Sequence, residues 1–146
     1  MMFNTIAIGC DHAALEYKDK LKLFLENKGY IVLNMGTDSA DSCDYPVFAN
    51  KVCEKVLSKE ADCGILICGT GIGMSMASNR HKGIRAAVCS DLKSCEFTRL
   101  HNDANVLCMG ARIISYELCE KLAIKFLTTN FMGGKHKTRI DMFDSV

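Results

Sequence analysis

A cysteine at the head of a glycine-rich turn is the feature of this 146-residue chain with the clearest chemical meaning. An apolar run (64–67) leads into Cys68-Gly69-Thr70-Gly71-Ile72-Gly73, and a helix-like stretch follows from Met74 to His81. Glycines let a backbone approach a ligand closely, and unpaired N–H groups at a helix N-terminus attract negative charge. The same positive end favours the thiolate form of a cysteine. The pattern predicts chemistry on a substrate that is anionic or becomes anionic in the transition state.

Titratable side chains near the ends of other predicted strands are further candidates. Asp11 and His12 follow a strand predicted at 6–9, and Arg112 follows one predicted at 105–109. In doubly wound sheets ligands bind outside the carboxyl ends of the strands, so these side chains are expected near Cys68. Structural interpretations stay open as well, with Asp11 as a helix cap and Arg112 as a solvated loop residue.

His101 and Asn102 lie just before the last predicted strand, at the end of a helix, so topology alone does not place them beside Cys68. A helix C-terminus favours both residue types for purely structural reasons. Lys135 and Arg139 belong to a basic cluster that could equally be solvated surface. These four residues gain weight as site candidates only in combination with the thiol and the glycine-rich turn.

Strand-like and helix-like stretches alternate along the chain. Strands are predicted at 6–9, 30–35, 63–68, 84–89 and 105–109, and helices at 15–28, 46–59, 74–81, 91–99 and 115–128, with a short helix after Lys135. Pro46 suits a first helical turn, and Asp91 and Ser115 are predicted N-caps. The pattern predicts an α/β fold, a single-domain (1–146), doubly wound, Rossmann-like sheet of five parallel strands with helices on both faces.

Composition and charge exclude several classes of protein. The formal net charge is +1, so there is no basic field that would attract nucleic acid. No apolar run approaches the roughly 20 residues that a membrane helix needs. We therefore expect a cytoplasmic protein with neither nucleic-acid nor membrane partners.

The nine cysteines form no Cys-x-x-Cys pair, and their number is odd. This spacing argues against both a zinc site and a disulfide framework, and we expect no metal. Most of the cysteines are expected to be small buried hydrophobic residues, as for Cys53 and Cys119 within amphipathic helical stretches. Cys68 is the exception because of its neighbours.

Six ordered motifs give the chain a family resemblance. They are Gly9-Cys10-Asp11-His12, Asp44-Tyr45-Pro46, Ile67-Cys68-Gly69-Thr70-Gly71-Ile72-Gly73, Ile84-Arg85-Ala86, Arg99-Leu100-His101-Asn102-Asp103 with Asn105-Val106-Leu107, and Gly133-Gly134 before a basic pair. With these motifs the chain resembles, nearly end to end, the type B ribose-5-phosphate isomerases. Their superfamily also holds the galactose-6-phosphate and allose-6-phosphate isomerases.

The resemblance implies an aldose–ketose isomerase of the pentose phosphate pathway that interconverts ribose 5-phosphate and ribulose 5-phosphate through a cis-enediolate, without a cofactor. Cys68 would move the proton between C2 and C1, His101 would assist ring opening, and Asp11 would help at the sugar hydroxyls. Backbone N–H groups of 69–73 would hold the enediolate oxygens. The implied site residues are Cys68, His101, Asp11 and Thr70 for catalysis, and His12, Tyr45, Gly69, Gly71, Ile72, Gly73, Asn102, Arg112, Lys135 and Arg139 for substrate binding. Among the latter, His12, Arg112, Lys135 and Arg139 would meet the phosphate.

Two positions bear on how closely the chain follows this family. One branch uses a cysteine as the base, and another carries a glutamate at the position of Met74, which cannot accept a proton, so the chain fits the cysteine branch. Lys135 stands where the family often has arginine, so phosphate binding should be somewhat looser because lysine lacks the bidentate fork. The resemblance also implies a homodimer, or a tetramer, with sites shared across the subunit interface.

Two other functions stay open at this point. The chain could isomerise a hexose 6-phosphate of the allose or galactose type, with the pocket near Tyr45 and the 38–44 loop deciding the substrate. It could also be a non-catalytic phosphosugar-binding or redox protein. The presence of both Cys68 and His101, and the absence of paired cysteines, favour an enzyme over that last alternative.

Overall fold

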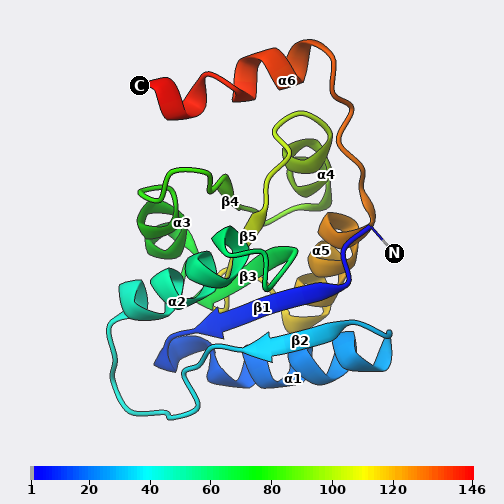
Figure 1. Cartoon of the computed structure of the whole chain (residues 1–146). Helices are drawn as coiled ribbons and strands as arrows, with labels where there is room; N and C mark the ends of the chain where they lie inside the picture. Colours follow the sequence, from blue (N-terminus) through cyan, green and yellow to red (C-terminus); the bar gives the residue numbers. More distant parts are fainter. Residues whose placement is uncertain (1) are drawn as a thin grey trace.

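Five short parallel strands form the centre of residues 2–146, the part of the chain that the computed structural model describes. They are β1 (Thr5–Cys10), β2 (Ile31–Asn34), β3 (Cys63–Cys68), β4 (Ala86–Val88) and β5 (Val106–Gly110). Their order across the sheet is β2-β1-β3-β5-β4 (Figure 1). The middle strand, β3, is buried along its whole length.

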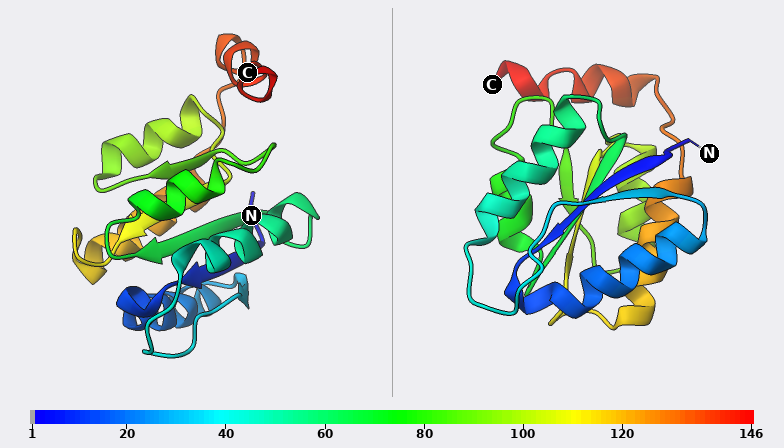
Figure 2. Two further views of the ribbon diagram at one scale, coloured as in Figure 1. Left: turned by 90° about the vertical axis from the view of Figure 1, so that its left-hand side faces the viewer. Right: turned by 60° about the horizontal axis from the view of Figure 1, so that its bottom comes forward.

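Within the same residues, six α-helices surround the sheet or extend beyond it. They are α1 (Leu15–Asn27), α2 (Tyr45–Leu57), α3 (Ile72–Ser78), α4 (Leu92–Leu100), α5 (Tyr116–Thr128) and α6 (Lys135–Ile140), with 3-10 turns at His12–Ala14 and Phe143–Ser145. Figure 2 shows α1, α4 and α5 on one face of the sheet and α2 and α3 on the other. The predicted α/β architecture with helices on both faces is therefore confirmed.

Alternation along the strands divides the core between the two faces. In β3, Ile65 and Ile67 pack on the side of α1, α4 and α5, whereas Leu66 and Cys68 pack on the side of α2 and α3. This period of two follows from the pleat of the strand. Burial on both faces explains why β3 is a continuous apolar run in the sequence. Cys68 is the last residue of that run, and the same alternation places its sulfur on the face of α2 and α3.

The order of the strands reverses between β1 and β3. From β1 the chain passes to β2 on one side and then to β3 on the other. Crossover helices leave such a point on opposite faces and open a crevice at the carboxyl ends of the strands. Cys10 ends β1 and Cys68 ends β3, so both lie at this edge of the sheet.

The helix caps follow the prediction, but several element bounds do not, above all those of the fourth strand and the third helix. Asp91 and Ser115 cap α4 and α5 by accepting the N–H groups of Ser94 (2.7 Å) and Leu118 (3.2 Å). The fourth strand, predicted at 84–89, is shorter at both ends. The third helix, predicted at 74–81, begins and ends earlier.

Asparagine side chains account for the late start of β4 and the early end of α3. The Arg85 N–H donates to Asn105 Oδ1 at 2.7 Å rather than to a neighbouring strand, so β4 begins only at Ala86. Asn79 bonds both backbone groups of Ala86, with Nδ2 to the carbonyl at 2.9 Å and the N–H to Oδ1 at 2.8 Å. This contact turns the chain out of α3 directly after Ser78.

After α5 an extended connector carries the chain to α6, which lies beyond the end of α4 (Figure 1). The Met132 N–H donates to the Leu100 carbonyl at 3.0 Å, and the Gly83 N–H donates to the Asp144 carboxylate at 3.1 Å. These contacts hold the C-terminal segment near the amino-terminal edge of the sheet. No helix in residues 2–146 combines the length and the apolar character needed to cross a membrane.

Candidate active site

An open cleft of about 460 Å³ lies at the carboxyl ends of β1 and β3. Its lining comes from the ends of both strands, the loop after β5, and helices α2 and α3: Asp11, Tyr45, Cys68, Gly69, Thr70, Ile72, Gly73, Met76 and Arg112. All of these except Met76 belong to the set of site residues predicted from the sequence. The switch point of the sheet therefore gathers most of the predicted site.

The Cys68 sulfur belongs to this cleft and is held by the glycine-rich turn. The residue is 5% exposed, and the Gly71 N–H donates a hydrogen bond to Sγ at 3.1 Å. A hydrogen bond of this kind is stronger to a negatively charged acceptor than to a neutral one. The Ala111 N–H also fixes the Cys68 carbonyl at 2.8 Å. The arrangement suits a sulfur that takes up a proton and returns it.

The glycine-rich turn adopts a backbone that other residues would resist. Gly71 has a φ of +79°, and a Cβ at this position would lie 2.9 Å from the Met109 carbonyl carbon. Thr70 closes the turn because its Oγ1 accepts the Ile72 N–H at 3.2 Å. Within residues 2–146 the N–H groups of Thr70 and Gly73 donate no hydrogen bond, which leaves both available to a ligand.

Tyr45 and Arg112 cover two of the glycines in this turn. A Cβ at Gly73 would lie 2.5 Å from Tyr45 Cζ, so the phenol ring lies directly on Gly73. A Cβ at Gly69 would lie 3.2 Å from Arg112 Nη1, so the guanidinium covers Gly69. Arg112 is exposed and forms no ion pair with any residue of the described chain. An unpaired guanidinium beside the cleft can bind an anionic group.

Asp11 both caps a helical turn and lines the cleft. It is 8% exposed, and its Oδ1 accepts the Ala13 N–H at 3.0 Å. His12 is not among the residues that line the cleft. Its Nδ1 accepts the Cys43 N–H at 3.2 Å, so a neutral imidazole carries its proton on Nε2. The loop before α2 therefore orients the His12 ring, a contact that no motif indicates.

Lys18 supports this edge of the sheet from within the core. Its side chain is fully buried, and Nζ donates to the Thr37 carbonyl at 2.7 Å and to Asp38 Oδ1 at 2.6 Å. The Thr37 N–H in turn donates to the Cys10 carbonyl at 2.9 Å. Lys18 thus ties the loop after β2 to the end of β1. The sequence carries a signal for this role, because Lys18 falls on the apolar stripe formed by Ala14, Leu21 and Leu25.

Four predicted site residues lie at the opposite edge of the sheet: His101, Asn102, Lys135 and Arg139. His101 is the C-cap of α4, which runs antiparallel to the strands, so it lies at their amino-terminal edge. Its ring stacks on that of His136, with 4.2 Å between the centroids and 13° between the planes. Asn102 lines a separate hollow of about 420 Å³ at this edge. A single chain therefore does not bring these four residues to Cys68.

His136 and Met76 are two residues of these regions that the sequence-based prediction omits. Partial burial, together with the charges of His101, Lys135 and Arg139, lowers the pKa of His136. Its place between Lys135 and Arg139 in the basic cluster is the signal that could have identified it. Met76 follows Ile72 by one helical turn of α3, which puts both side chains on the same face of the helix.

Known proteins match this chain along nearly all of its length. The sequence profile of the Ribose/Galactose Isomerase family matches residues 6–143. Ribose-5-phosphate isomerase B of Escherichia coli (strain K12) is 40% identical over 141 residues, which are 97% of this chain and 95% of that protein.

Two solved structures superpose closely on the described fold. A ribose 5-phosphate isomerase of Thermotoga maritima gives a TM-score of 0.96 at 49% identity, covering 98% of this chain and 99% of that one. Ribose-5-phosphate isomerase B of Clostridium thermocellum gives a TM-score of 0.95 at 42% identity, covering 97% of this chain and 95% of that one. These matches confirm the resemblance inferred from the motifs, and the chain belongs to the Ribose/Galactose Isomerase family.

Proposed function

We propose that this protein interconverts ribose 5-phosphate and ribulose 5-phosphate, with Cys68 as the base. The observation that carries the proposal is the contact between the Gly71 N–H and Cys68 Sγ in a cleft at the switch point of the sheet. It places a proton acceptor beside backbone donors that are free to bind oxygen. The named relatives, which are ribose-5-phosphate isomerases, support the same substrate.

The proposed reaction moves two protons, one from C2 to C1 and one from O2 to O1, and needs no external oxidant. The Cys68 thiolate takes the C2 proton of the open-chain aldose, and the electrons left behind form the C1–C2 double bond of an enediolate with negative charge on O1. The thiol returns the proton to C1, and the proton of the C2 hydroxyl moves to O1, which leaves the carbonyl at C2. The Thr70 and Gly73 N–H groups are the donors for the charged oxygens, a role commonly worth ~3–4 kcal/mol per donor.

Other residues of the cleft would bind the sugar rather than react with it. The Asp11 carboxylate can accept hydrogen bonds from the sugar hydroxyls. Arg112 has no ion-pair partner in residues 2–146, so its guanidinium can bind a phosphate through two parallel hydrogen bonds. Tyr45 would limit the width of the cleft on the opposite side.

A homodimer would complete the site. In this proposal a second copy brings His101, Asn102, Lys135 and Arg139 to the cleft, where His101 assists ring opening. Exposed apolar side chains support an interface next to the cleft, since Ile72 is 49% and Met76 66% exposed on α3. Apolar surface of this kind commonly marks a site of protein association.

An isomerase assay on ribose 5-phosphate, beside allose and galactose 6-phosphates, tests the proposal. We expect turnover of the pentose phosphate by the wild type, and loss of nearly all of it in Cys68→Ala. Cys53→Ala is the matched control, because Cys53 is a fully buried thiol on the same face of the sheet. Substantial activity in Cys68→Ala would remove Cys68 from the role of base.

The same assay separates the remaining alternatives. The matched family contains both ribose and galactose isomerases, so turnover of a hexose 6-phosphate alone would keep the chemistry and change the substrate. No turnover of any of the three would favour a phosphosugar-binding or redox protein.

A further inference from the structure

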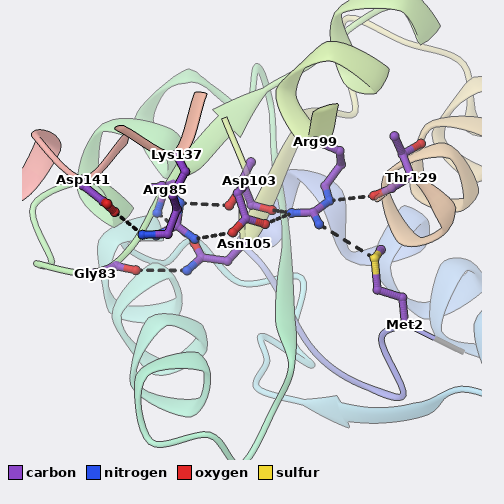
Figure 3. Close-up of polar contacts among 10 residues, drawn as sticks. Met2, Gly83, Arg85, Arg99, Asp103, Asn105, Thr129, Lys137 and Asp141 are labelled. Atoms are coloured by element: carbon purple, nitrogen blue, oxygen red, sulfur yellow. Dashed lines mark hydrogen bonds and ion pairs between the residues drawn. The ribbon is translucent and has the colours of Figure 1, made fainter. Parts of the chain in front are cut away.

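A carboxylate held between two guanidinium groups lies under the turn that carries His101 and Asn102. Arg99 Nη1 lies 2.8 Å from Asp103 Oδ1, and Arg85 Nη2 lies 3.4 Å from Asp103 Oδ2 (Figure 3). Arg85 Nε also donates to the Asp103 carbonyl at 2.9 Å. The two arginines therefore hold both carboxylate oxygens of Asp103 and its main-chain carbonyl oxygen.

The backbone of Asp103 needs such support. Its φ of +45° is in the left-handed region, which Asp103 shares with only one other non-glycine residue of the described chain, Lys59. Aspartate and asparagine tolerate this region better than most residues, but the conformation persists only where the surroundings enforce it. At Asp103 the two arginines supply that constraint.

Arg99 also reaches the segment that leads to α6. Its Nε donates to the Thr129 carbonyl at 3.1 Å, and its Nη1 donates to the Ala104 carbonyl at 2.6 Å. The side chain is 3% exposed, and the guanidinium lies 4.9 Å from the centre of the Phe3 ring. One buried guanidinium thus connects the turn after α4 with the start of the connector that leads to α6, the helix that carries His136.

We propose that Arg99 and Asp103 are positioning residues for the stacked pair His101 and His136. They touch neither the cleft nor its thiol, and they act by fixing the 101–103 turn relative to the connector after α5. The inference rests on the proposed function, in which His101 assists ring opening. In this proposal the Arg99–Asp103 ion pair fixes the position of the His101 imidazole, in addition to any contribution to the stability of the fold.

Asp103→Asn is the variant that isolates this role. Asparagine keeps the size of the side chain and its tolerance of the left-handed backbone, so only the charge is removed. Glu26→Gln is the matched control, because the Lys22–Glu26 pair has the same i,i+4 spacing, a similar distance of 3.0 Å and a similarly exposed carboxylate (38% against 34%). The control pair lies on α1, away from His101.

The two substrates of the proposed reaction separate positioning from general damage. Ribose 5-phosphate is mostly a closed furanose, whereas ribulose 5-phosphate cannot close that ring because its O5 carries the phosphate. We expect Asp103→Asn to lower kcat for ribose 5-phosphate by about tenfold or more, and kcat for ribulose 5-phosphate by less than about twofold. The imidazole resonances of His101 should shift in the NMR spectrum of Asp103→Asn but not in that of Glu26→Gln.

A second variant and a reference variant make the outcomes distinct. Arg99→Lys keeps the charge but not the planar fork, so it should show the same selective loss. If His101→Ala is selective for ribose 5-phosphate while Asp103→Asn behaves like the wild type, the positioning role is wrong and the proposed function stands. If His101→Ala lowers both rates equally, the ring-opening role itself is wrong. An equal loss on both substrates in Asp103→Asn, with unshifted His101 resonances, would reduce the ion pair to a structural element.

Discussion

His101 and His136 stack face to face, with 4.2 Å between the ring centroids, although they are 35 positions apart in the sequence. Two imidazoles at this distance repel each other when both are protonated, because like charges disfavour the charged form. The stack on His101 therefore contributes to the lowered pKa of His136.

The lowered pKa of His136 gives the protein a measurable dependence of stability on pH. The pKa of His136 is lowered, first by partial burial and then by the neighbouring positive charges, so the unfolded chain takes up the proton at a higher pH than the folded one. The free energy of unfolding should therefore rise with pH between the lowered pKa and the ordinary value of about 6.5. Urea unfolding at several pH values between about 5 and 8 measures the slope. His136→Gln should remove this contribution, and an identical slope in the variant would contradict the assignment.

Gly71→Ala should destabilise the fold and distort the site together. The alanine would have to adopt a φ of +79°, and its Cβ would lie 2.9 Å from the Met109 carbonyl carbon. We expect a loss of about 3 kcal/mol, from about 1–2 for the backbone and the rest from crowding. Gly133→Ala isolates the backbone part, since Gly133 has a φ of +71° and open space around it. Equal unfolding free energies for the two variants would show that crowding is unimportant.

Mixed oligomers test whether the cleft and the amino-terminal edge meet between chains. With ribose 5-phosphate as substrate, Cys68→Ala and His101→Ala should each be nearly inactive alone. Coexpressed in equal amounts, they should regain about a quarter of wild-type activity, because about half of the dimers are mixed and each mixed dimer keeps one intact site. Cys68→Ala with Arg112→Ala is the control. Both lesions then lie at the same edge and no site is intact, so recovery in that pair would count against sharing.

Lys135→Arg should tighten phosphate binding. Lys135 is exposed at the start of α6 and forms no ion pair within residues 2–146. Arginine would offer the phosphate two parallel hydrogen bonds in place of one, worth ~1 kcal/mol or about fivefold in KM, with kcat little changed. Steady-state kinetics on ribose 5-phosphate measures both constants. A rise in KM would contradict a phosphate-binding role for this position.

Lys18→Met should cost far more stability than the same change at Lys22. Removing the Lys18 ammonium leaves the Thr37 carbonyl without its 2.7 Å donor in a buried environment, which costs about 1–3 kcal/mol. Lys22 belongs to a partly exposed i,i+4 pair with Glu26, worth about 0.3–0.5 kcal/mol. Thermal or urea unfolding of the two variants compares them directly. Similar values would mean that water replaces the lost donor at Thr37.

The sequence predicts the fold, and the grouping of the candidate residues at the cleft, for a topological reason. Cys68, Asp11 and Arg112 follow strands, and every parallel strand end lies at the same edge, so the order of the elements is enough to bring them together. Asp91 and Ser115 are predicted as caps because capping depends on neighbours in the chain. Boundaries set by long-range side-chain contacts escape this reasoning, as with Asn105 at the start of β4.

The candidate residues at the amino-terminal edge of the sheet, by contrast, could not be placed from the sequence. The motif that contains His101 marks this residue as a candidate. The edge of the sheet at which His101 lies is set by the direction in which α4 runs. The stacking of His136 on His101 depends on how the connector after α5 is held by Arg99. Neither relationship has a local signal. They arise from contacts between segments that are distant in the chain.

The two groups of candidate site residues, those at the cleft and those on α6, differ in how firmly the fold holds them. Cys68 is the last residue of β3, which is hydrogen-bonded to β1 on one side and to β5 on the other. Its sulfur therefore leaves its position only when the sheet itself opens. Lys135, His136 and Arg139 lie on a six-residue helix reached through an extended connector. Segments of this kind open locally long before the core unfolds. A protease that cuts once within 129–134 should therefore abolish the isomerase activity while the sheet stays folded.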